Sequence, residues 1–145
     1  MLEKRDGHKD RGRGFTLIEL LVVLVILGLL ASLVGPRVMK YLGGAKSDSA
    51  KFQIENLAAS LDTYRLEVGR YPTTDEGLRA LVEAPAGAPN WKGPYLKKKQ
   101  VPKDPWGNEY HYQSPGENGD FDLYTFGADN SEGGDGENKD VVSWE

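Results

Sequence analysis

An acidic residue lies inside the most apolar stretch of this chain. Residues 15–34 carry one charged side chain, Glu19. A carboxylate in hydrocarbon is costly unless it is paired, so an acid placed there marks a functional site. A cation one helical turn away could pair with Glu19. The alternative is that Glu19 reaches the membrane surface, because it lies near the start of the segment.

A second group of carboxylates lies near the C-terminus. Residues 127–144 are rich in glycine and hold five acidic side chains, which are Asp129, Glu132, Asp135, Glu137 and Asp140. Carboxylates this close repel one another, and glycines lose much entropy when they are ordered. Calcium would offset both effects, because it takes six to eight oxygen ligands. Composition alone leaves two interpretations open, a flexible acidic loop and a loop that binds calcium.

The spacing of these acids does not make an EF-hand. The twelve residues from Asp129 to Asp140 have Gly134 at the sixth position, as an EF-hand loop does. However, Gly133 stands where Asp or Asn is expected, and the twelfth residue is Asp rather than the longer Glu. Strands rather than helices are predicted on either side. We therefore reject the EF-hand.

The apolar segment has the length of a membrane span. As a helix, its 20 residues would rise about 30 Å, which matches the hydrocarbon core of a bilayer. Residues 1–14 carry five basic side chains, which favours the cytoplasmic side for the leader and the opposite side for residues after 35. An ordinary secretory signal has a shorter apolar region and small residues at its cleavage site. Here Arg37 follows Gly35-Pro36.

An amphipathic helix is predicted for residues 45–68, on the N-terminal side of Gly69. Its apolar residues recur at spacings of three and four, and they are Ala50, Ile54, Leu57, Leu61, Tyr64 and Val68. This periodicity places them on one face, which predicts packing on a domain of the same chain. Between the two helical stretches, Pro36 and Gly43-Gly44 predict a kink or local unwinding.

Shorter elements are predicted in the rest of residues 35–145. Thr73 and Glu76 have the spacing of a capping box, which predicts a short helix at 74–83. Alternating residues predict antiparallel strands in EYHYQ and FDLYTFG and a third near VVSW, within residues 109–145. One face of this sheet must pack on the amphipathic helix, because an isolated hairpin is unstable. The predicted fold class is α+β.

Composition excludes several classes of function. The net charge is −4, and residues 116–145 hold nine acids and one lysine, which argues against binding nucleic acid. The absence of cysteine excludes disulfides and thiolate chemistry. His8 lies in the leader, and His111 lies between two tyrosines of a predicted strand. Neither has the partners of a catalytic site, so we predict that the protein is not an enzyme; the alternative is a membrane-anchored periplasmic hydrolase.

The start of the apolar segment carries a specific motif. The sequence RGFTLIE followed by a long apolar helix resembles the signal of type IV pilins and pseudopilins. The resemblance implies that a prepilin peptidase cleaves after Gly14 and that Phe15 becomes the N-methylated terminus. Glu19 would then be the fifth residue of the mature chain. In an assembled filament it would meet the Phe15 amine of a neighbouring subunit.

Segments beyond the motif extend the resemblance to the C-terminus. LDTYRLEVGRYPTTDEGLRAL, PKDPWGNEYHYQSPG and DLYTFGAD are similar to the major pseudopilins of type II secretion. That family implies a type IV pilin-like fold and a subunit that polymerises through its N-terminal helix to drive export of folded proteins across the outer membrane. The implied location is the bacterial inner membrane, with the C-terminal domain in the periplasm. The implied partners are further copies of the chain, minor pseudopilins, the assembly platform and the outer-membrane secretin.

The resemblance also implies that the acidic loop binds calcium in a structural role. The matching positions are the side chains of Asp129 and Asp140 and the backbone oxygen of Phe126. Ser131 is a weaker candidate, and the insertion EGGDGEN leaves the other ligands open.

The alternative within the same superfamily is a type IV pilin that serves adhesion or twitching motility, and a minor pseudopilin is a third option. Many such pilins close a C-terminal loop with a cysteine pair, and this chain has no cysteine. The ending FGAD…KDVVSW also fits a pseudopilin better.

Overall fold

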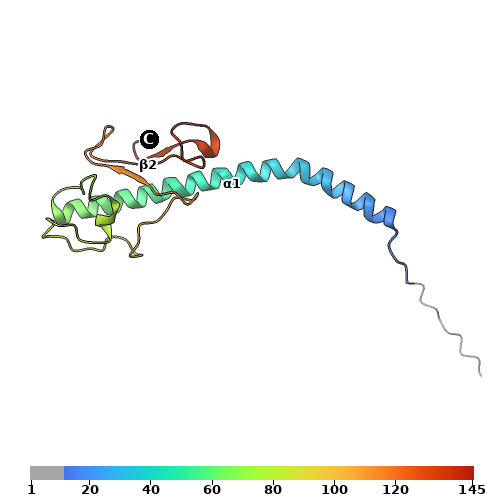
Figure 1. Ribbon diagram of the computed structural model, residues 1–145, viewed down its shortest axis with the longest axis horizontal. Coiled ribbons are helices and arrows are strands. Elements are labelled where there is room, and N and C mark those ends of the chain that lie inside the picture. Colours follow the sequence, from blue (N-terminus) through green and yellow to red (C-terminus); the bar gives the residue numbers. More distant parts are fainter. Residues whose placement is uncertain (1–11) are drawn as a thin grey trace, which may run out of the picture. The chain divides into compact units, whose positions relative to one another are not determined.

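The structure is a computed structural model that describes residues 12–145. It divides into two compact units between Val38 and Met39. Among the described residues, one α-helix and a small antiparallel sheet are the main elements, which confirms the predicted α+β class (Figure 1). The elements in chain order are α1 (Leu17–Val68), η1 (Leu78–Leu81), β1 (His111–Gln113), β2 (Asp122–Thr125), η2 (Gly136–Asn138) and β3 (Val141–Val142).

Helix α1 is unbroken across the region where an interruption was predicted. Its 52 residues include Pro36 and the pair Gly43-Gly44. Of the predicted kink or local unwinding, the unwinding is absent, because α1 stays helical through these residues. Proline removes one N–H donor from the helix, but helix formation is cooperative, and long helical stretches on both sides carry the structure through such a weak point.

The predicted apolar stripe forms the core of the unit from Met39 to Glu145. Five of its six residues are buried and Val68 is partly buried, which confirms the periodicity. Gly69 has a φ of 94°, and its N–H donates to the carbonyl of Arg65 at 2.8 Å. Glycine adopts this left-handed conformation without strain, so α1 ends where the sequence predicts.

The sheet has the order β1-β2-β3 with both pairs antiparallel. Tyr112 lies opposite Leu123, and Thr125 lies opposite Val141. Strand β2 runs beside the second half of α1 (Figure 1), and Leu123 belongs to the same buried cluster as the apolar stripe. The sheet therefore packs on the helix as predicted, although each strand is shorter than its predicted segment.

The short helix predicted at 74–83 is a 3₁₀ helix restricted to Leu78–Leu81. The capping box is present, because Thr73 N–H donates to Glu76 Oε2 at 2.9 Å and Glu76 N–H donates to Thr73 Oγ1 at 3.2 Å. An α-helix does not follow, because Gly77 has a φ of 61°, outside the helical region. The short helix predicted at 74–83 is therefore corrected in length, and it is a 3₁₀ helix.

The buried carboxylate of Asp104 joins the turn at residues 104–108 to strand β2. Asp104 is 4% exposed and accepts hydrogen bonds from Trp106 N–H at 3.0 Å and Asn108 N–H at 2.8 Å. It is also hydrogen-bonded to the hydroxyl of Thr125, the last residue of β2. Because Phe126 follows directly, this network fixes the start of the acidic loop.

Candidate functional site

The first half of α1 presents apolar side chains that its own chain does not cover. Leu17 is 88% exposed and Leu33 is 70% exposed, and the large apolar side chains between them are also exposed. This stretch is long and apolar enough to cross a membrane. A helix that is apolar on all sides is stable only in lipid or among other helices. The surface must therefore be covered by something outside the subunit.

Glu19 takes part in a capping box at the start of α1. Its Oε2 accepts a hydrogen bond from Thr16 N–H at 3.3 Å, and its own N–H donates to Thr16 Oγ1 at 3.2 Å. The carboxylate is therefore turned toward the N-terminal end of the helix, where the helix dipole favours negative charge. Sequence reasoning missed the role of Thr16. The T-x-x-E spacing was the signal that could have found it.

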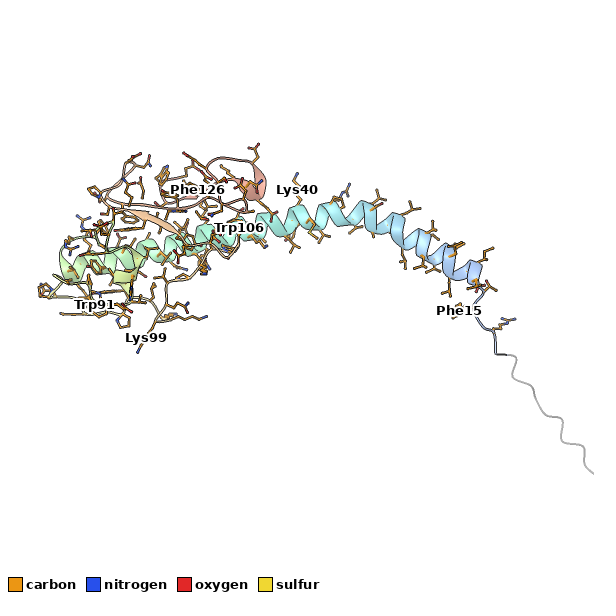
Figure 2. All side chains as sticks on the ribbon, viewed as in Figure 1. Phe15, Lys40, Trp91, Lys99, Trp106 and Phe126 are labelled. Carbon is orange, nitrogen blue, oxygen red and sulfur yellow. The ribbon has the colours of Figure 1, made fainter. Side chains whose placement is uncertain are left out.

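The predicted cleavage residues lie just before this cap. Gly14 and Phe15 are outside regular secondary structure and exposed, and Phe15 is 83% exposed at the N-terminal end of α1 (Figure 2). A peptidase requires an accessible peptide outside regular secondary structure. The other predicted leader features, including His8 and the first four basic residues, lie outside the described residues.

The acidic loop connects β2 to β3 and is held by short-range hydrogen bonds. Asp129 Oδ1 accepts from Ser131 N–H at 3.2 Å, and Asp140 Oδ2 accepts from Gly133 N–H at 3.0 Å. The N–H of Ala128 donates to the carbonyl of Glu137 at 2.8 Å. These contacts fold the loop back on itself, and its two ends meet where Thr125 of β2 pairs with Val141 of β3.

One oxygen of Asp140 is an unpaired acceptor. Its Oδ1 is buried and has no hydrogen-bond partner among the described residues. Burying a carboxylate oxygen without a hydrogen-bond partner costs free energy. This oxygen therefore requires a hydrogen-bond donor or a cation. Asp140 also lines a cleft of about 350 Å³ together with Phe126 and Glu132.

The structure brings together some of the predicted ligands and not others. Phe126 and Asp140 share the cleft, whereas Asp129 and Ser131 are exposed and lie outside its lining. Glu132 lies on the cleft, although sequence reasoning counted it only among the repelling acids. In Figure 2 Phe126 lies on the opposite side of α1 from Lys99. Residues 97–99 were interpreted as a solvated charge run, and all three are exposed.

These residues fit a hard cation better than a transition metal. Within residues 12–145, no three histidine or acidic side chains lie close enough together to bind a metal by themselves. The predicted set needs only two carboxylates, with a backbone and a hydroxyl oxygen beside them. Calcium binds such mixed sets of oxygen ligands, and the unpaired Asp140 Oδ1 is an oxygen ligand of this kind.

Comparison with known proteins gives the family. A family profile described as "Type II secretion system (T2SS), protein G" matches residues 37–144. The chain belongs to this family. A second profile, described as "Prokaryotic N-terminal methylation motif", matches residues 9–35. The two matches together cover the apolar segment and the domain that follows it.

Relatives in several bacteria share nearly the whole length. The type II secretion system core protein G of Pseudomonas aeruginosa is 52% identical over 136 residues, which are 91% of this chain and 94% of that protein. The protein of the same name from Vibrio cholerae is 47% identical, over 90% of each chain. A crystal structure of the major pseudopilin from the type 2 secretion system of enterohaemorrhagic Escherichia coli is 34% identical. It matches 75% of this chain and 95% of that one with a TM-score of 0.62.

Proposed function

We propose that this chain is the major structural subunit of a type II secretion pseudopilus. Copies polymerise through the apolar half of α1, and the filament drives export of folded proteins across the outer membrane. The observation that carries this proposal is the exposed apolar surface of α1 in a member of the protein G family. A type IV pilin is the weaker alternative, because the relatives described above are named as secretion proteins.

Filament assembly requires contacts between subunits that do not close into a ring. Identical subunits form a fibre when one surface of each copy binds a different surface of the next. The long apolar face of α1 supplies such a surface, since it offers apolar contact along many turns. Energy must come from elsewhere in the machine, and the proposed role is structural rather than enzymatic.

The proposed processing site is the bond between Gly14 and Phe15. A prepilin peptidase cleaves there, and the new amine of Phe15 is methylated, in line with the profile match over residues 9–35. The amine then pairs with Glu19, and in the filament with Glu19 of a neighbouring copy. Such pairing neutralises both charges before the helix is buried among apolar surfaces.

The proposed topology places the leader in the cytoplasm and the domain from residue 35 on in the periplasm. The basic leader and the apolar helix support an inner-membrane anchor. In this position the subunit meets the prepilin peptidase, the assembly platform, the minor pseudopilins and, as part of the filament, the outer-membrane secretin.

The acidic loop is proposed to bind one calcium ion. Asp129 and Asp140 would bind through their side chains, Phe126 through its backbone oxygen and Ser131 through its hydroxyl. Bound calcium would neutralise the loop carboxylates and attach the loop to the sheet. The role is stabilisation by linkage, because a ligand that binds only the folded state adds to its stability.

The N-terminal residue of protein purified from its native membrane tests the proposal. Mass spectrometry should show chains that begin with a methylated Phe15, and a deletion strain should fail to secrete its type II cargo while keeping twitching motility. Native protein that begins at Met1 and still supports secretion would contradict the processing step. Loss of twitching with normal secretion would favour the pilin.

A further inference from the structure

Gly43 lies where the acidic loop meets α1. It is buried, whereas its neighbour Gly44 is exposed. A Cβ built at Gly43 would lie 2.8 Å from Glu137 Oε1 and would overlap the side-chain carbons of Glu137. A Cβ at Gly44 would meet no described atom within 4 Å outside its own helix turn and chain neighbours. A side chain at Gly43 would therefore displace the exposed Glu137 side chain, whereas one at Gly44 would displace nothing.

A second glycine supports the same segment from its other side. Gly127 has a φ of 76°, and a Cβ there would lie 2.7 Å from the carbonyl oxygen of Glu137 and 2.8 Å from that of Lys139. The adjacent N–H of Ala128 donates to the Glu137 carbonyl. Residues 136–139 are thus held between α1 and the end of β2, with a glycine on each side.

The position of this segment determines the position of Asp140. Asp140 follows Lys139 directly, and it lines both the cleft shared with Phe126 and a smaller cleft of about 170 Å³. The smaller cleft is bounded on the α1 side by Ser47 and Lys51. Any shift of residues 136–139 away from the helix would therefore move the carboxylate whose Oδ1 is unpaired.

We propose that Gly43 is a positioning residue for the calcium loop. Its missing side chain leaves room for the Glu137 side chain, through which η2 rests on α1, and this contact places Asp140 for the cation. The inference depends on the calcium site proposed above. Coupling between two sites is reciprocal, so calcium in the loop should also stabilise the turn of α1 around Gly43.

The test compares two matched variants of the full chain in detergent micelles. Gly43→Leu introduces a side chain under η2, and Gly44→Leu introduces the same side chain one residue away into open space. Isothermal titration calorimetry with calcium should show binding at least about tenfold weaker for Gly43→Leu, the scale of losing a support for a metal ligand. Gly44→Leu should bind as the unmodified chain does.

A second measurement separates displacement of the loop from unfolding. Hydrogen exchange without calcium should rise at the amide of Ala128 in Gly43→Leu and stay unchanged across Ile54–Tyr64. With calcium, the amides around Gly43 should become protected in the unmodified chain. Adding Glu137→Ala to Gly43→Leu should restore part of the affinity, because the colliding atoms belong to the Glu137 side chain.

The outcomes distinguish this inference from the proposed function. Normal calcium binding and unchanged Ala128 exchange in Gly43→Leu would overturn the positioning role alone. Equal losses in Gly43→Leu and Gly44→Leu would also overturn it, because the effect would then come from the helix and not from the loop. Failure of the unmodified chain to bind calcium would overturn the calcium site itself, and this inference with it.

Discussion

The two halves of α1 are parts of one helix with opposite relations to their own chain. In the first half, large apolar side chains such as Leu24 and Leu30 are more than half exposed. In the second half, Leu57 and Leu61 are almost completely buried against the domain. Helical periodicity accounts for the contrast, since the second half has one apolar face and the first is apolar on every side.

This difference separates folding from assembly within one helix. The second half obtains its stability from the core of the subunit, so its substitutions should act on the free energy of unfolding. The first half buries no large apolar side chain in the core of the subunit, so substitutions there should affect membrane insertion and filament formation. Each prediction below tests whether that separation holds.

The largest effect is expected from Glu19→Ala. The variant should enter the membrane and keep the melting temperature of its domain, but it should form almost no filaments. Removing one member of a buried charge pair costs about 3–5 kcal/mol, because the other charge is left unpaired. Electron microscopy and chemical cross-linking would measure filaments, and a thermal melt would measure the domain.

Glu55→Ala is the matched control for this prediction. Glu55 is also an acid on α1, but it is exposed in the second half. Its removal should leave filaments and stability unchanged. If Glu19→Ala formed filaments as the unmodified chain does, assembly would not depend on the charge pair. If it lowered the melting temperature, the first half of α1 would also contribute to folding.

The next effect concerns the second half alone. Leu61 is 0% exposed and Leu66 is 86% exposed on the same helix. Leu61→Ala should lower the free energy of unfolding by about 2–5 kcal/mol, because it removes buried methyl groups and leaves a cavity. Leu66→Ala should change it by less than about 0.5 kcal/mol. Urea titration followed by tryptophan fluorescence would measure both, and equal losses would contradict the observed packing.

Calcium should produce a smaller effect, confined to the domain. Saturating calcium should raise the melting temperature of the full chain, since binding at a hundred times the dissociation constant adds about 2.7 kcal/mol. Asp129→Ala or Asp140→Ala should abolish the increase. Glu55→Ala should keep it, because Glu55 is an exposed acid of α1 that lies outside the loop. Identical melting curves in calcium and in chelator would contradict the calcium site.

Sequence periodicity predicted most of the fold because apolar spacing reports which face of an element is buried. The stripe from Ala50 to Val68, the helix end at Gly69 and the antiparallel strands are all confirmed. The local unwinding predicted near Pro36 is absent. A local rule for proline cannot include the cooperativity of a 52-residue helix.

The candidate sites were less predictable because they depend on contacts between distant segments. The position of Glu19 in the apolar run was evident, whereas its hydrogen bonds with Thr16 required the T-x-x-E spacing to be recognised at a helix start. The contact between Gly43 and Glu137 joins residues far apart in sequence. No local pattern indicates which of the two adjacent glycines faces the loop.

The smallest effect is expected from the charge of Glu76, again in the domain half. Its two carboxylate oxygens accept hydrogen bonds from Arg70 at 2.8 and 2.9 Å, and this guanidinium lowers the pKa of Glu76 below its ordinary value. A lowered pKa means that the folded state favours the carboxylate. The stabilisation is therefore present above the unfolded pKa of about 4.3 and is lost as pH falls through the folded pKa.

Glu76→Gln removes this charge but keeps an oxygen for the N–H of Thr73. The Arg70 side chain is 40% exposed, so solvent screening limits the loss at pH 7 to about 0.2–1 kcal/mol. The difference between the two proteins should shrink below about pH 4, as Glu76 becomes protonated. Glu83→Gln is the control, because Glu83 and its partner Arg79 are both mostly exposed and should contribute close to nothing. A difference that persists unchanged at pH 3 would show that the two side chains contribute through packing rather than through charge. Filament formation by Glu76→Gln should be normal at neutral pH, since its effect belongs to the half of the molecule that folds on its own core.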